Sequence, residues 1–130
     1  MRQTTRCLRM DAAVQNILIV EDDPFLCEDL AMLLEERLGL EVVTSPTVAA
    51  ALNRYGPQTA FAFLDVNVLD GTSMPVAEAL SRSNIPFAFI SGGTRSDIPD
   101  TWRHVPFFRK PISSHSMVEM ICERTNIGAA

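Results

Sequence analysis

Short runs of apolar residues, each ending on a polar residue, constrain the fold of this 130-residue chain more than any other feature. A short apolar run without alternation is typical of a strand covered on both faces, as in a parallel sheet. Neighbouring parallel strands would bring the polar ends of such runs together at one edge. The runs are NILIV before Glu21 and Asp22, AFAFL before Asp65, PFAFI before Ser91, and VPFFR, which leads into Lys110.

Segments with helical spacing alternate with the apolar runs. Asp23 and Pro24 are suited to begin a helix in which leucines recur every three or four residues, and Gly39 is suited to end it. Pro46 is expected to open the next helix, which Gly56 and Pro57 end. The sequence predicts strands at 16–20, 40–44, 60–64, 86–90 and 105–108, and later helices near 73–82 and 113–124, with a brief one at Pro99.

Strands that alternate with helices predict an α/β fold with a doubly wound, five-stranded parallel sheet. The usual small solution has the strand order 2-1-3-4-5, and ligands bind at the carboxyl ends of strands one and three, where the order reverses. We expect one domain over residues 15–126, a leader at 1–14 and a tail at 127–130.

Charge and cysteine content narrow the class of function. The formal net charge is −5, which argues against non-specific nucleic-acid binding. Three widely spaced cysteines suggest neither a disulfide framework nor a zinc site, and no apolar stretch is long enough to span a membrane. We therefore expect a cytoplasmic protein, a monomer or weak dimer, whose partners are proteins or small anions rather than nucleic acid or membrane.

Carboxylates meeting at one edge of the sheet indicate a cation site. Each pair costs roughly 4 kcal/mol at about 4 Å and an effective dielectric near 20, so either their pKa values rise or a cation lies between them. Oxygen ligands without His or Cys point to Mg²⁺. Asp22 and Asp65 are the expected direct ligands, Glu21 would act through water, and the backbone carbonyl of Asn67 would complete the protein's share.

A carboxylate at such a site can also be a nucleophile that forms an aspartyl phosphate. Asp65 is the best candidate because the third strand is central, Lys110 offers an ammonium and Ser91 a hydroxyl. Backbone N–H groups at the starts of loops could hold phosphate oxygens. The expected donors are those of Val66, Asn67 and Gly92.

These motifs, in this order, resemble the receiver domain of two-component response regulators over about residues 15–126. The matching elements are V-E-D-D, the Asp ending strand three, Ser91-Gly92 and Lys110-Pro111. The resemblance implies a flavodoxin-like receiver fold and a cis Lys110-Pro111 bond. It also implies that Asp65 accepts phosphate from a histidine kinase or phosphotransfer protein, with Asp22 on Mg²⁺, Lys110 on the phosphate and Ser91 as the switch hydroxyl.

Some residues depart from the family pattern. The loop after Asp65 is two residues shorter than usual. The strand-four motif is similar to the P-F-x-F-x-T-G-Y motif of stand-alone alphaproteobacterial receivers, with Ser91 in place of Thr and Gly93 in place of Tyr. The aromatic switch position falls on Phe107, which has no hydroxyl. Coupling of the hydroxyl to a rotating tyrosine is therefore in question, while phosphorylation itself is still expected.

Three functions remain open from the sequence. The first is a single-domain phosphoacceptor, with self-catalysed phosphoryl transfer and slow dephosphorylation, that signals to a downstream protein. The second is a receiver-like binding module that works without phosphate. The third is a metal-dependent phosphatase, which would generally need a second Asp two residues after Asp65, where Asn67 stands.

Overall fold

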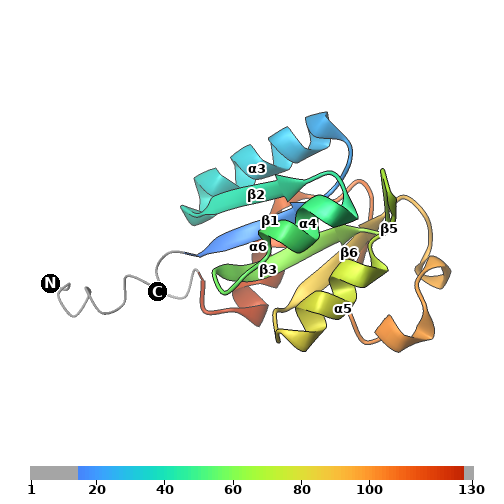
Figure 1. Ribbon diagram of the computed structural model, residues 1–130. Coiled ribbons are helices and arrows are strands. Elements are labelled where there is room, and N and C mark those ends of the chain that lie inside the picture. Colours follow the sequence, from blue (N-terminus) through green and yellow to red (C-terminus); the bar gives the residue numbers. More distant parts are fainter. Residues whose placement is uncertain (1–14, 128–130) are drawn as a thin grey trace, which may run out of the picture.

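The computed structural model describes residues 15–127 and contains a central five-stranded parallel sheet (Figure 1). Its order, β2-β1-β3-β6-β7, is the expected 2-1-3-4-5 order once the strands of this sheet alone are counted. The fold is thus the flavodoxin-like α/β arrangement that the alternating runs predicted. The strands are β1 (Asn16–Val20), β2 (Glu41–Ser45), β3 (Thr59–Asp65), β6 (Phe87–Ser91) and β7 (Phe107–Arg109).

Four α-helices cover the two faces of the sheet. Helices α3 (Pro24–Leu38) and α6 (Ser114–Arg124) pack on one face, and α4 (Val48–Arg54) and α5 (Met74–Arg82) on the other (Figure 1). Successive residues of a strand point to opposite faces, so each apolar run supplies both cores. In β3, for example, Phe61 and Phe63 pack under α3 and α6, whereas Ala62 and Leu64 pack under α4 and α5.

Helix α3 begins and ends where the sequence predicts. The Asp23 carboxylate accepts hydrogen bonds from the N–H groups of Phe25 and Leu26, and Pro24 occupies the first turn, where its missing N–H costs nothing. Gly39 ends the helix with a φ of 69°, a left-handed conformation that glycine adopts without steric cost. These caps direct the chain into α3 immediately after the polar end of β1.

Three parts of the chain differ from expectation. Helix α4 begins at Val48 rather than Pro46, because the Thr47 hydroxyl accepts the Ala50 N–H and so caps the first turn. The loop after β3 is not plain coil but an antiparallel hairpin of β4 (Asn67–Val68) and β5 (Gly71–Thr72). Two-residue strands are too short for periodicity to reveal.

Between β6 and β7 lie two 3₁₀ turns, η1 (Arg95–Asp97) and η2 (Asp100–Trp102), where one brief helix was expected.

The expected leader at 1–14 and most of the expected tail, 128–130, lie outside the described residues. Within residues 15–127, no helix combines the length and hydropathy that crossing a bilayer requires.

Two adjacent leucines of α3 test the assignment of its inner face. Leu34 is fully buried and Leu33 is 41% exposed. We expect Leu34→Ala to lower the free energy of unfolding by about 2–5 kcal/mol, because it removes packed methyl groups and leaves a cavity. Leu33→Ala, the matched control, should cost less than about 1 kcal/mol. Urea denaturation measures both, and equal losses would contradict the packing described here.

Candidate functional site

Parallel strand register brings the polar residues to one edge of the sheet. Val20 is paired with Leu64, so Glu21 and Asp22 emerge next to Asp65 at the end of β3. The register continues from Asp65 to Ile90 in β6 and from Ser91 to Arg109 in β7. The Lys110 N–H then donates to the Ser91 carbonyl at 2.8 Å, which fixes the start of the loop after β7. Four polar strand ends therefore converge as the sequence predicts.

The Lys110 ammonium joins two of the carboxylates. Its Nζ donates to Asp65 Oδ2 at 3.1 Å and lies 2.7 Å from Glu21 Oε1. The contact with Glu21 is an ion pair without hydrogen-bond geometry, so Glu21 Oε1 has no hydrogen-bond partner within residues 15–127. Both acids are buried, with Glu21 1% and Asp65 7% exposed. The Lys110–Pro111 bond is cis, as the resemblance implies.

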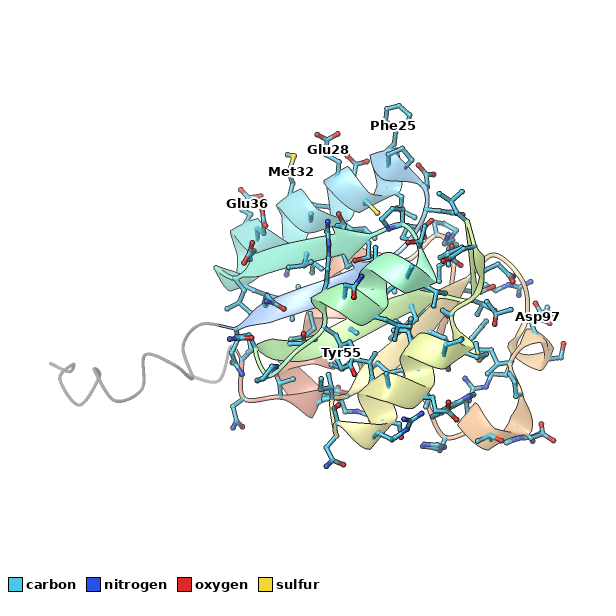
Figure 2. All side chains as sticks on the ribbon, in the orientation of Figure 1. Phe25, Glu28, Met32, Glu36, Tyr55 and Asp97 are labelled. Carbon is cyan, nitrogen blue, oxygen red and sulfur yellow. The ribbon has the colours of Figure 1, made fainter. Side chains whose placement is uncertain are left out.

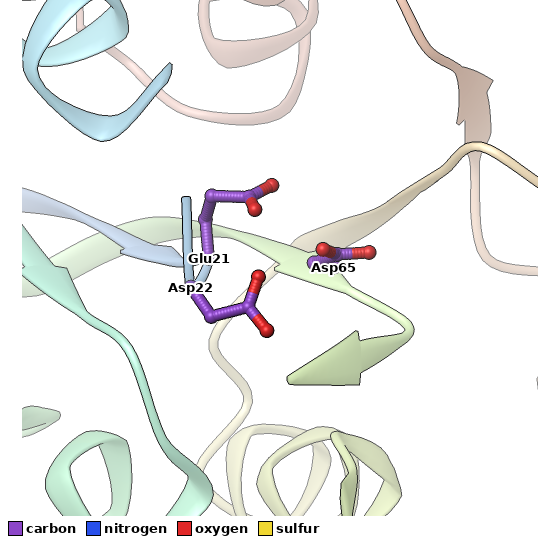
Figure 3. Close-up of side chains that lie close together, drawn as sticks. All are labelled: Glu21, Asp22 and Asp65. Atoms are coloured by element: carbon purple, nitrogen blue, oxygen red, sulfur yellow. The ribbon is translucent and has the colours of Figure 1, made fainter. Parts of the chain in front are cut away.

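Glu21, Asp22 and Asp65 form a compact acidic cluster (Figure 3). One carboxylate oxygen from each lies within 4.8 Å of the others, and Figure 3 shows Glu21 and Asp22 at the end of β1 beside Asp65 at the end of β3. Three carboxylates and one ammonium carry a net charge of −2 when all are ionised. A hard dication such as Mg²⁺ matches this charge and donor set, and the buried Glu21 Oε1, which has only the Lys110 ion pair and no hydrogen bond within residues 15–127, supports the fit.

The site perturbs the ionisation of its members. Burial raises the pKa of the Glu21 carboxyl above its ordinary value, although Lys110 and the N–H of Asp23 act in the opposite direction. Burial also pulls the pKa of Lys110 down, but its contacts with Glu21 and Asp65 outweigh this effect and the pKa is raised. Lys110 is therefore a fixed positive charge at neutral pH.

Cys27 contacts the backbone of Glu21 at the start of the loop after β1. Its Sγ donates to the Glu21 carbonyl at 3.2 Å, and burial together with the negative charge of Glu21 raises the pKa of the thiol to about 11. The thiol therefore stays protonated at neutral pH and steadies the loop after β1.

Ser91 is buried at the end of β6, and its hydroxyl oxygen accepts the N–H of Gly93 at 2.9 Å. A Cβ at Gly93 would collide with the carboxylate of Asp97, which itself accepts the Thr94 N–H at 2.9 Å. Glycine at this position lets η1 fold close over the end of β6. This arrangement explains physically why a tyrosine, as in the family motif, would not fit at residue 93 without moving Asp97.

Phe107, at the position of the family's aromatic switch, is half-buried under a cation. The Arg95 guanidinium lies 5.6 Å from the Phe107 ring centroid and donates to the carbonyls of Trp102, Arg103 and Val105. No sequence pattern pointed to Arg95. One arginine therefore joins η1, η2 and the segment before β7 beside the Phe107 ring.

The predicted phosphate-binding N–H groups lie in different surroundings. The Val66 N–H donates to the Ile90 carbonyl at 3.2 Å and is therefore engaged in the sheet rather than free for an anion. Asn67 is exposed on β4, and Gly92 is exposed directly after Ser91, where an added Cβ would meet no atom within 4 Å. The open space around Gly92 leaves room for a group bound at the end of β6.

Asp70 is a further residue that the sequence analysis did not assign to the site. Its place before Gly71 predicts a turn residue, but its carboxylate accepts the N–H groups of Val48 and Ala49 at 2.7 and 3.2 Å. These hydrogen bonds lower the pKa of the Asp70 carboxyl. An acid beside a glycine is ordinary turn chemistry, and no sequence signal shows which helix end it will meet.

Comparison with known proteins supports the family resemblance and the fold. No protein-family model matches the chain, and no curated protein matches it significantly. Among solved structures, SdrG from Sphingomonas melonis Fr1 is 38% identical, with 85% of this chain and 95% of that chain covered and a TM-score of 0.71. The BeF3-activated conformation of SdrG from Pseudomonas melonis Fr1 is also 38% identical, with 84% and 94% covered and a TM-score of 0.67. A CheY-like response regulator receiver domain protein from Methanospirillum hungatei JF-1 shares the fold at 21% identity, with 85% and 92% covered and a TM-score of 0.73.

Removal of one negative charge tests the acidic cluster as a cation site. We expect Mg²⁺ at about 100 times its Kd to raise the Tm of the wild type by roughly 5–10 °C. Asp22→Asn should raise the metal-free Tm, because repulsion is relieved, and should abolish most of the Mg²⁺ effect. Asp29→Asn, an exposed acid on α3, should respond to Mg²⁺ like the wild type. Thermal unfolding with and without Mg²⁺ measures this, and an unchanged Mg²⁺ response in Asp22→Asn would exclude Asp22 as a ligand.

Proposed function

Because this chain belongs to the response regulator receiver family, we propose that it accepts a phosphoryl group on Asp65 and signals through protein contacts. The observation that carries the proposal is the pairing of the buried Asp65 carboxylate with the Lys110 ammonium, beside two further acids. A carboxylate held in this way is positioned to attack, and the ammonium stays in place to balance the charge that arrives with the phosphoryl group.

The transfer step follows from the contacts of Asp65. Lys110 holds Oδ2, and we assign the attack to Oδ1, which forms a bond to the phosphorus of a phosphohistidine. The bond between phosphorus and the imidazole nitrogen breaks, its electron pair goes to that nitrogen, and solvent supplies a proton where the imidazole needs one. The products are an acyl phosphate on Asp65 and a free histidine on the donor.

The neighbouring groups bind and orient the phosphoryl oxygens. The Lys110 ammonium can contact the phosphoryl oxygens while the Lys110 backbone stays bound at the sheet edge. The Ser91 oxygen already accepts the Gly93 N–H, so the Ser91 O–H is free to donate to a phosphoryl oxygen. Glu21, Asp22, Asp65 and the Asn67 carbonyl would hold Mg²⁺, which supplies charge neutralisation of the acids and the phosphoryl oxygens.

Each chain would carry one phosphoryl group and lose it slowly to water, rather than turn over a substrate repeatedly. Asn67 stands where a phosphatase would generally place a second Asp, so the chain offers no acid at that position to protonate a leaving group.

Cys27 and Cys122 are free thiols, which supports a reducing, cytoplasmic setting for the transfer.

Substitution of the acceptor tests the proposed chemistry. With Mg²⁺ and a small phosphodonor such as acetyl phosphate, we expect one base-labile phosphoryl group per wild-type chain and none on Asp65→Asn, which lacks a nucleophilic carboxylate. Asp29→Asn should label like the wild type. Intact-protein mass spectrometry and mapping of the labelled residue measure this. A label that survives Asp65→Asn would sink the assignment, and continuous release of phosphate would favour a phosphatase.

The outer face of α3 beside the site fits a protein phosphodonor. Phe25, in the first turn of α3 directly after the acidic loop, is 78% exposed, and Met32 is 64% exposed (Figure 2). Figure 2 shows these side chains pointing away from the sheet together with Glu28 and Glu36. A donor that brings a phosphohistidine to Asp65 must contact the surface around Asp65, and apolar and basic groups on that donor would complement the outer face of α3.

Small and protein donors should respond differently to changes on this face. We expect Phe25→Ala to slow transfer from a cognate histidine kinase or phosphotransfer protein by roughly tenfold, about 1.4 kcal/mol, because an apolar contact is lost. Labelling by acetyl phosphate should not change. Leu52→Ala, a partly exposed leucine on α4, is the control and should leave both rates intact. Time courses of transfer measure the rates, and equal slowing with both donors would contradict a docking role.

A phosphorylation-independent binding module is the second candidate, favoured by the Arg95–Phe107 contact in place of a tyrosine switch. On that alternative, a downstream protein would bind wild type and Asp65→Asn equally, with or without the mimic BeF3⁻. On the proposed function, BeF3⁻ should change the affinity of the wild type for that protein and leave Asp65→Asn unaffected.

A further inference from the structure

Asp70 bridges two loops that are far apart in the sequence. It lies in the turn of the β4–β5 hairpin, and its two carboxylate oxygens accept the N–H groups of Val48 and Ala49 at the start of α4. Helix α4 already has a cap of its own, because the Thr47 hydroxyl accepts the Ala50 N–H at 3.0 Å. Asp70 therefore does more than complete a helix end, since it also holds the hairpin against α4.

The hairpin has few other anchors. Each of its strands has two residues, and an isolated two-stranded hairpin is marginally stable at best in water. Val68 is buried, but Leu69 is 70% exposed and contributes little packing. The Ser73 N–H donates to the Val66 carbonyl at 2.9 Å and closes the base of the hairpin. Without Asp70, the tip would be free to hinge about Val68 and that base.

The bridge closes a ring of loops around the acidic cluster. On one side, the N–H of Glu21 donates to the Ser45 carbonyl at 3.0 Å, which joins the loop after β1 to the end of β2. The chain then runs through Thr47 into α4, where Asp70 joins it to the hairpin that follows Asp65. Figure 1 shows the hairpin standing at this edge of the sheet, next to the start of α4. The loops that follow β1, β2 and β3 are thereby tied to one another.

We infer that Asp70 is a positioning residue for the metal and phosphoryl site. Its contact with α4 fixes the hairpin and so fixes the backbone of Asn67, the first residue of β4, which lies two residues after Asp65. The lowered pKa of Asp70 keeps the carboxylate charged, and the contact intact, at neutral pH. This inference rests on the proposed function, because it concerns how the same site is held in shape.

The test compares three variants of the full chain. Asp70→Ala removes both acceptors, Asp70→Asn retains one acceptor oxygen without the charge, and Thr47→Ala removes the cap of α4 while the hairpin contact remains. We expect Asp70→Ala to weaken Mg²⁺ binding and slow acetyl phosphate labelling by about tenfold, as for other groups that orient metal ligands. Asp70→Asn should be intermediate. Thr47→Ala should lower the Tm but leave Mg²⁺ affinity and labelling unchanged.

Amide hydrogen exchange at Val48 and Ala49 reports whether the contact is lost, and an Mg²⁺ titration followed by NMR measures the affinity. If exchange becomes faster in Asp70→Ala while Mg²⁺ affinity and labelling stay at wild-type values, the positioning role is overturned and Asp70 is a helix cap only. The positioning role is also overturned if Thr47→Ala weakens Mg²⁺ binding as much as Asp70→Ala does. A wild type that takes no label on Asp65 would instead overturn the proposed function, and the inference with it.

Discussion

The Lys110 ammonium between two buried carboxylates is the contact on which the functional edge of this protein depends. Glu21 and Asp65 are both buried at the ends of adjacent strands, and with Asp22 they bring three carboxylate oxygens within 4.8 Å of one another. Such a cluster is costly unless positive charge compensates it. Lys110, directly after β7, supplies one positive charge. The remaining net charge of −2 gives the site its capacity for a dication.

The architecture of the sheet makes this contact possible. Because β1, β3, β6 and β7 are parallel neighbours, their carboxyl ends lie at one edge. The apolar residues of each strand alternate between two cores, so the strands are held from both faces by helices. The energy that fixes the charged groups in place therefore comes from apolar burial elsewhere in the domain, since the site itself is electrostatically unfavourable.

The loops around the site carry the features particular to this chain. Gly93 lets Asp97 approach the end of β6, and Arg95 holds two 3₁₀ turns above Phe107. These contacts lie where the P-F-x-F-x-T-G-Y motif that the sequence resembles has a tyrosine. Ser91 contacts Gly93, and Arg95 in the adjacent η1 contacts the Phe107 ring. No aromatic hydroxyl is present at residue 107.

Local pattern and spacing along the chain were enough to predict the order of the strands, the residues at their carboxyl ends and the caps of α3. The same pattern placed Asp22, Asp65, Ser91 and Lys110 at one edge of the sheet, and the strand register confirms that placement. The three-dimensional arrangement was needed to show that Val66 uses its N–H in the sheet, that Glu21 pairs directly with Lys110, and that Asp70 reaches α4. Each of these contacts joins residues distant in sequence, and its geometry depends on strand register and on how loops settle against one another, which no local pattern encodes.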